Sequence, residues 1–168
     1  MISITRNSAD KPVKIIYAGE VFASDEDVYV ETLLGSCIAV VLHDSTAGLS
    51  GMNHFMFPGG ATDKNPRHET ARYGSDAILE LIAEMIRKGA DRNNLIAKIF
   101  GGGHVLKEKN TPVMIPENNI RLANAILEME DIPVVERNVG RNYSRKIQMN
   151  VKTGEVKCIM SEYSKNDD

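Results

Sequence analysis

The stretch from residue 32 to residue 57 reads TLLGSCIAVVLHDSTAGLSGMNHFMF and contains two apolar runs separated by a turn. The first run, Cys37 to His43, is short and rich in β-branched residues, which is typical of a buried strand. Residues 44–48 are polar and end in a glycine, which predicts a reversal of the chain. The second run, Leu49 to Phe57, therefore returns as the partner strand of a hairpin.

This hairpin predicts that a cysteine and a histidine lie close together. If residues 44–48 form the turn, Cys37 lies roughly opposite position 55, and His54 is its neighbour across the two strands. A cysteine thiol has a pKa of about 8.5 and needs a nearby base to act as a nucleophile near neutral pH. The pattern allows a nucleophile–base pair. It also allows a cysteine that only packs and a core histidine bonded to the backbone.

The strand before the cysteine offers a third residue that can orient the histidine. Alternation along residues 28–34 places Thr32 on the apolar, inward face and Glu31 on the other face. A base in a catalytic set is usually held by a third group, and a threonine hydroxyl can accept a hydrogen bond from an imidazole. Threonine is also common in strands for its shape alone, and the pattern by itself favours this interpretation over an orienting role.

The rest of the chain predicts an α+β fold. Apolar residues at helical spacing predict helices over residues 71–88 and 116–130. Further strands are expected at residues 13–17, 28–34, 95–100, 134–138, 145–151 and 155–160. We expect a layered α/β sandwich of mixed, largely antiparallel strands with two main helices. Residues 1–168 are expected to be a single domain, with loose tails at 1–12 and 161–168.

The composition excludes several function classes. The net charge is −3 and no basic stripe is present, so nucleic acid is not an expected partner. No apolar run approaches the ~20 residues of a membrane span, and the N-terminal residues lack a signal-peptide core. We therefore expect a cytoplasmic protein without membrane insertion, in which Cys37 and Cys158 are free thiols. Without CxxC or HExxH spacing, neither a metal nor another cofactor is expected.

Two weaker signals are interpreted as structural. The Gly101-Gly102-Gly103 run lacks the Lys-Ser/Thr of a phosphate-binding loop, which favours a tight turn. A local basic cluster is typical of a solvated surface, although it could contact an acidic partner. Its members are Arg137, Arg141, Arg145 and Lys146.

Two motifs carry a resemblance to a known family. The segments TLLGSCIAV at residues 32–40 and GMNHFMFP at residues 51–58 resemble the signature of the CheD family, the chemoreceptor glutamine deamidases of bacterial and archaeal chemotaxis. The similarity continues through Gly101-Gly102-Gly103 and Asn118-Asn119, from about Tyr17 to about Met160. It implies a fold similar to the deamidase domain of cytotoxic necrotizing factor toxins.

The resemblance also implies a catalytic set. Cys37 matches the family's nucleophile, His54 its general base and Thr32 its third member, although some members carry the threonine one position earlier, where this chain has Glu31. The implied reaction is deamidation of a glutamine side chain through a cysteine thioester, with release of ammonia. In this mechanism, Ser36 and Asn53 are expected near the oxyanion.

The implied partners are the cytoplasmic helices of methyl-accepting chemoreceptors and, in many species, a CheC-type phosphatase. An alternative is a non-catalytic binding module that regulates such a phosphatase or the receptor array. A cysteine protease or a transglutaminase-like enzyme would use the same cysteine chemistry on a different substrate.

Overall fold

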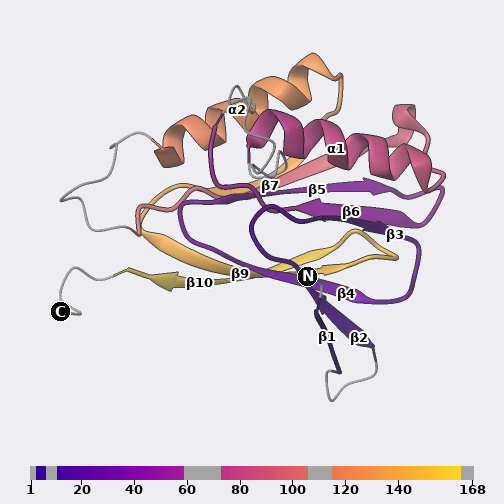
Figure 1. Cartoon of the computed structure of the whole chain (residues 1–168), viewed down its shortest axis with the longest axis horizontal. Helices are drawn as coiled ribbons and strands as arrows, with labels where there is room; N and C mark the ends of the chain where they lie inside the picture. Colours follow the sequence, from indigo (N-terminus) through magenta and orange to yellow (C-terminus); the bar gives the residue numbers. More distant parts are fainter. Residues whose placement is uncertain (1–2, 7–10, 59–72, 106–114, 164–168) are drawn as a thin grey trace, which may run out of the picture.

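The computed structural model describes residues 3–6, 11–58, 73–105 and 115–163. They form three layers, in which two helices cover one sheet and the other face of that sheet packs on a second sheet (Figure 1). Most neighbouring strands in the sheets are antiparallel and two pairs are parallel. The layered α/β sandwich with mixed, largely antiparallel strands is therefore confirmed.

The helix-covered sheet has its most buried strand at its centre. In spatial order it contains β3 (Val21–Ser24), β6 (Leu49–Asn53), β5 (Ile38–Asp44), β7 (Ile96–Gly101) and β8 (Val134–Val139). Every residue of β5 is buried, because Ile38, Val40 and Leu42 face the helices while Ala39 and Val41 face the second sheet. A strand covered on both faces has no polar face, which explains its continuous apolar sequence.

The second sheet has one covered face. In spatial order it contains β1 (Ser3–Arg6), β2 (Pro12–Ile15), β4 (Tyr29–Leu34), β9 (Tyr143–Asn150) and β10 (Val156–Glu162). Val30 and Leu34 of β4 and Ile147 and Met149 of β9 are buried between the sheets, whereas Leu33 is exposed. This alternation is the period-two pattern of a strand with one solvated face.

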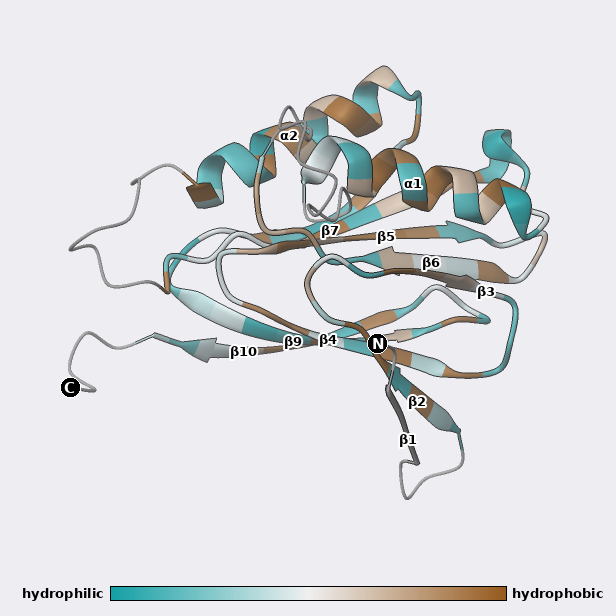
Figure 2. Cartoon of the chain, viewed as in Figure 1, coloured by the Kyte–Doolittle hydropathy of each residue, from teal (hydrophilic) through white to brown (hydrophobic). Residues whose placement is uncertain are grey.

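Two amphipathic helices, α1 (Gly74–Arg87) and α2 (Ile115–Met129), form the outer layer, and a short 3₁₀ helix spans Arg92–Asn94. Figure 2 shows apolar and polar residues interspersed along both α-helices. The buried apolar residues of both helices face the sheet, and α1 ends before Gly89, whose positive φ of 113° suits the end of a helix. No helix in the described ranges is long and apolar enough to cross a bilayer.

The structure corrects two sequence predictions. Ser3–Arg6 was expected to lie in a loose tail, but it forms β1, because pairing with β2 satisfies its backbone. At the other end, β10 continues to Glu162, two residues into the expected tail. The short edge strand β3 was missed because four residues give little periodicity. Residues 164–168 and the expected helix start at 71 lie outside the described residues.

Candidate functional site

Cys37 lies at the crossing from one sheet to the other. β4 of the second sheet ends at Leu34, and β5 of the helix-covered sheet begins at Ile38, so residues 35–37 connect the layers. The Gly102 N–H donates to the Cys37 carbonyl and the Gly103 N–H to the Gly35 carbonyl, both at 2.9 Å. The expected tight turn is not formed: Gly101 ends β7, and the amides of the next two glycines hold the segment of the cysteine.

The β5–β6 hairpin brings His54 to the same face as Cys37. Ile38 and Phe55 exchange backbone hydrogen bonds, which shifts the predicted register by one residue and sets His54 opposite Ala39. Since Ala39 and Cys37 are two residues apart, Cys37 lies diagonally across from His54 on the face between the sheets. The sequence prediction that these two residues are neighbours agrees with this register.

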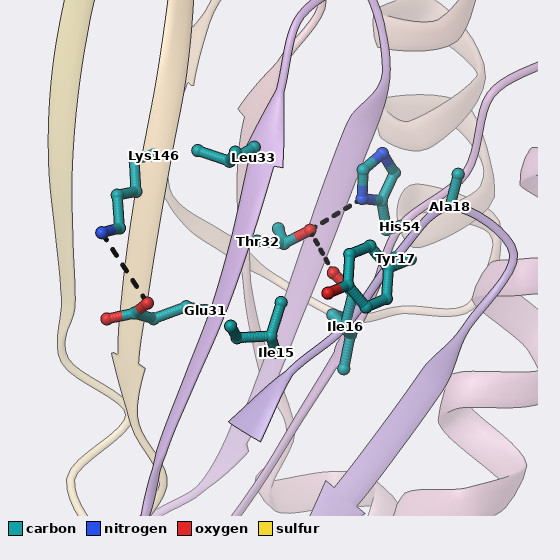
Figure 3. Close-up of a pocket in the computed structure, with 9 residues that line it drawn as sticks. All are labelled: Ile15, Ile16, Tyr17, Ala18, Glu31, Thr32, Leu33, His54 and Lys146. Carbon is teal, nitrogen blue, oxygen red and sulfur yellow. Dashed lines mark hydrogen bonds and ion pairs between the residues drawn. The ribbon is translucent and has the colours of Figure 1, made fainter. Parts of the chain in front are cut away.

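Thr32 determines which ring nitrogen of His54 carries the proton. The Thr32 hydroxyl donates to the Ile16 carbonyl at 2.8 Å, and its Oγ1 lies 2.8 Å from His54 Nδ1 (Figure 3). A hydroxyl has one proton, so Oγ1 must accept from a protonated Nδ1. Nε2 then carries a free lone pair, and Figure 3 shows it pointing away from Thr32.

Glu31, the alternative to Thr32, faces away from the histidine. Its carboxylate accepts from Gln148 Nε2 at 2.7 Å and lies 3.8 Å from Lys146 Nζ. Both partners belong to β9 on the outer side of the sheet. The structure therefore brings Thr32, and not Glu31, into contact with His54.

Burial makes both members of the pair neutral at rest. It lowers the pKa of His54 to about 4 and raises the pKa of the Cys37 thiol above its usual value. Among the hydrogen bonds of the described residues, none joins Cys37 Sγ to His54. The arrangement is thus a thiol beside a neutral imidazole whose Nε2 can accept a proton.

The two expected oxyanion residues have different surroundings. Within the described part of the chain, the N–H groups of Ser36 and Cys37 donate to no backbone carbonyl. Asn53 is fully buried, and its Oδ1 accepts from the Val40 N–H at 2.8 Å. Because Asn53 lies opposite Val40, it belongs to the helix-facing side of the sheet. The structure therefore does not bring the Asn53 side chain to the face of Cys37 and His54.

A pocket of about 290 Å³ opens beside the histidine. It forms where the chain after β2 passes from one sheet to the other. The Ile16 N–H donates to the Glu31 carbonyl of β4, and the Gly19 N–H donates to the His54 carbonyl, next to the end of β6. Cys37 does not line this pocket. Its lining residues, drawn in Figure 3, are Ile15, Ile16, Tyr17, Ala18, Glu31, Thr32, Leu33, His54 and Lys146.

Two residues near the site were assigned no role in it from the sequence. Arg145 was grouped with surface arginines, but it is 2% exposed and donates to the Gly140 carbonyl at 2.8 Å and to Asn138 at 2.9 Å. Asn119 is fully buried and contacts the Ser36 carbonyl. Arg145 also donates to the Gly101 carbonyl at 3.4 Å, so both residues contact segments distant in sequence, for which an apolar pattern carries no signal. Among the described residues, no group of three His, Cys, Asp or Glu side chains could hold a metal ion.

These features define a class of protein. It is a three-layer α/β/β domain with a cysteine, a histidine and a threonine at the strand ends between its two sheets. A thiol with a neutral imidazole beside it can attack a carbonyl carbon, which is the first step of cysteine-based acyl transfer.

The comparisons with known proteins define the family. The model of the family "CheD chemotactic sensory transduction" matches residues 56–159. The chain is 41% identical over 143 residues to "Probable chemoreceptor glutamine deamidase CheD" of Methylobacillus flagellatus, covering 84% of this chain and 70% of that protein. It is 43% identical over 146 residues to "Probable chemoreceptor glutamine deamidase CheD 1" of Shewanella oneidensis, covering 86% and 70%. The chain belongs to the CheD family.

Among solved structures, the chain is similar to the Bacillus licheniformis hypothetical protein YfiH, with a TM-score of 0.43 and 13% identity over 70% of this chain and 49% of that one. The expected similarity to cytotoxic necrotizing factor toxins is not among these matches and stays a prediction. The family match begins at residue 56, after Cys37 and His54. The roles of these two residues therefore depend on the geometry described above.

Proposed function

We propose that this chain is a protein-glutamine glutaminase that converts glutamine side chains of chemoreceptors to glutamate. The observation that carries the proposal is the hydrogen-bond chain from His54 through Thr32 to the Ile16 carbonyl, on the face that also holds Cys37. Relatives at 41% and 43% identity bear the name chemoreceptor glutamine deamidase. The cytoplasmic helices of such receptors are accordingly the proposed partners.

In the proposed reaction, the Cys37 sulfur attacks the carboxamide carbon of the glutamine. Because burial raises the pKa of the thiol, His54 Nε2 accepts the thiol proton as the carbon–sulfur bond forms. His54 then gives this proton to the amide nitrogen, and the carbon–nitrogen bond breaks. Ammonia departs, and the substrate stays bound to Cys37 as a thioester. A water molecule that transfers a proton to His54 hydrolyses the thioester, which yields glutamate and restores the thiol.

The oxyanion of each tetrahedral intermediate is assigned to the backbone N–H groups of Ser36 and Cys37. The carbonyl groups on either side of these donors are fixed by hydrogen bonds from Gly102 and Gly103. Fixed donors are effective because they need no reorganisation during the reaction, and the loss of one typically costs about 3–4 kcal/mol of barrier. The Asn53 side chain has no part in this assignment.

The pocket beside His54 is the proposed entrance for the glutamine. Its volume of about 290 Å³ and its apolar walls suit the aliphatic stem of a long side chain. Tyr17 and Leu33, at its rim, are 52% and 70% exposed, so they can pack against the surface of a receptor helix. The substrate would bring its carboxamide to the free Nε2 of His54 and from there to Cys37.

Mass spectrometry of receptor fragments tests the proposal. A fragment of the cytoplasmic helices is incubated with the protein, and deamidation raises the mass of the modified peptide because oxygen replaces an NH group. We expect conversion with the wild-type protein and with Cys158→Ala, and none with Cys37→Ala or His54→Ala. Equal conversion by Cys37→Ala and the wild type would refute the assignment of the nucleophile.

A second candidate is a binding module that regulates a CheC-type phosphatase without catalysis. It is favoured by the raised pKa of Cys37 and by the missing hydrogen bond between Cys37 Sγ and His54 among the described residues. The same experiment separates the two candidates. A wild-type protein that binds receptor fragments or a phosphatase but converts no glutamine would support the binding role.

A further inference from the structure

One buried asparagine connects the two strand ends that carry the cysteine and the histidine. Asn119 lies in α2 and is fully buried. Its Nδ2 donates to the Ser36 carbonyl at 3.3 Å and to the Met56 carbonyl at 3.1 Å. Ser36 immediately precedes Cys37, and Met56 follows His54 by two residues. A single amide group therefore contacts both segments of the site.

The contact occurs where the β5–β6 pairing stops. The last backbone pair between the two segments is Ile38 with Phe55, and Phe57 then pairs with Tyr73. Beyond Ile38 and Phe55 the strands diverge, so no backbone ladder fixes the separation of residue 36 from residue 56. The two N–H groups of the Asn119 side chain link the two segments in place of a direct backbone hydrogen bond between them.

We propose that Asn119 is a positioning residue that sets the distance between Cys37 and His54. This inference rests on the proposed function only for its effect on catalysis; the geometry itself does not depend on it. Donation to both carbonyl groups holds the turn before Cys37 and the segment after His54 at one separation. A displacement of about 1 Å between reacting groups can reduce a rate about 100-fold, so such a link matters for a thiol and its base.

The other atom of the amide supports a role beyond packing. Asn119 Oδ1 is buried and has no hydrogen-bond partner among the described residues. A buried polar atom without a partner destabilises a fold, and an apolar side chain of similar shape avoids that cost. The asparagine is therefore a poor choice for filling space alone, whereas its two donors suit the two carbonyl groups.

Asn124, on the same helix, provides a matched control. Its Nδ2 donates to the Ile120 carbonyl at 2.9 Å, and its Oδ1 accepts from Arg137 Nε at 2.8 Å. It makes as many hydrogen bonds as Asn119, but none of them reaches the segments of Cys37 or His54. Asn124→Ala therefore removes two hydrogen bonds from the outer layer without touching the site.

The test compares Asn119→Ala, Asn119→Leu and Asn124→Ala in the full chain. Leucine has the branching of asparagine but donates no hydrogen bond, so Asn119→Leu should fold while leaving both carbonyls unpaired. With a receptor fragment as substrate, we expect both Asn119 variants to lower kcat about 10- to 100-fold with little change in KM. Asn124→Ala should retain the wild-type kcat even if its melting temperature falls.

Alkylation by iodoacetamide gives a second measurement that does not need the enzymatic activity. The rate at Cys37 relative to that at Cys158 should change in both Asn119 variants and stay constant in Asn124→Ala. An unchanged ratio in folded Asn119 variants, a kcat within twofold of wild type, or the unfolding of both variants would overturn the proposal. If the wild type deamidates no fragment, the proposed function fails, and the alkylation ratio still decides the role of Asn119.

Discussion

At the scale of single residues, one hydroxyl group determines the protonation of the histidine. The Thr32 hydroxyl donates its one proton to the Ile16 carbonyl. It can therefore only accept from His54, which must donate from Nδ1. The sequence placed Thr32 on the inward face but left Glu31 open as a competitor. Alternation identifies the face of a residue, whereas the partner Ile16 comes from the segment after β2, which no local pattern connects to Thr32.

Replacing Thr32 by valine tests this role. Valine keeps the shape but leaves the Ile16 carbonyl and His54 Nδ1 without partners, which should lower the free energy of unfolding by about 1–3 kcal/mol. We expect kcat to fall about 10- to 100-fold because the imidazole is no longer held in one tautomer and orientation. Kinetics with a receptor fragment and urea unfolding measure the two effects.

The controls for this variant are Thr32→Ser and Glu31→Gln. Serine keeps the hydroxyl and should retain most of the activity. Glu31 lines the pocket but contacts β9 and not His54, so Glu31→Gln, which keeps the shape of the side chain, should leave kcat near the wild-type value even if KM changes. A Glu31→Gln variant as slow as Thr32→Val would show that the third residue has been misassigned.

At the scale of elements, the position of the segment before β5 depends on the glycine run at the end of β7. A Cβ atom at Gly101 would collide with the Cys37 carbonyl, and one at Gly103 would collide with the Tyr143 carbonyl. These residues are glycines because three backbone segments meet at close range there, and the amides of the second and third glycine donate to backbone carbonyls of the segment before β5. The run was predicted to be a tight turn, but Gly101 ends β7 and the two glycines after it bond to the segment before β5.

Gly103→Ala tests this close packing. The added methyl group must displace the Tyr143 carbonyl, and the hydrogen bond from Gly103 N–H to Gly35 is disturbed with it. We expect the free energy of unfolding to fall by about 2–4 kcal/mol, together with a lower kcat, because the turn that carries Cys37 shifts. Urea unfolding and fragment kinetics measure both.

Gly48→Ala is the matched control for this variant. Gly48 has a positive φ of 61° but open space around its Cα, so alanine there meets backbone strain without a collision. We expect a loss of about 1 kcal/mol and an unchanged kcat, since Gly48 lies in the turn at the far end of β5. Similar losses of activity in both variants would contradict a specific role for the Gly103 contact.

At the scale of the whole molecule, the packing of two sheets buries histidines between them. His43 Nδ1 lies 2.7 Å from Ser50 Oγ, which donates to the Val151 carbonyl of the second sheet at 2.6 Å. This repeats the arrangement of His54, Thr32 and Ile16 at the other end of β5. Burial lowers the pKa of both histidines, so the packed sheets require neutral imidazoles.

The stability of the protein should therefore depend on pH in a definite direction. The unfolded chain protonates His54 near pH 6.5, whereas the folded protein keeps it neutral down to a pKa of about 4. Between these values the unfolded state binds more protons, so stability is full above pH 6.5 and falls by about 3 kcal/mol as the pH drops to about 4. Urea unfolding from pH 7.5 to pH 4 measures this loss.

The variant His54→Gln isolates this contribution. It removes the titrating group, so its stability should depend less steeply on pH than that of the wild type over the same range. His43, whose pKa is also lowered by burial, accounts for part of the remaining slope. Identical slopes for the wild type and His54→Gln would mean that His54 is protonated in the folded protein.

The sequence by itself determined the two helices, the hairpin and the neighbourhood of Cys37 and His54. These features are local, because their periodicity and turn residues lie within one continuous segment. The spacing of the apolar residues that become buried can therefore be read directly from that segment. The boundaries shifted by a few residues, since strand ends depend on neighbouring strands.

Only the tertiary structure decided how the site is held. Thr32 meets Ile16 across 16 residues of sequence, and Asn119 meets Ser36 across 83. The packing of the layers also buries Arg145. The same packing desolvates Cys37 and His54 and thereby keeps both neutral. Such contacts depend on which distant segments pack together, and hydrogen bonding and desolvation take effect only once those segments meet.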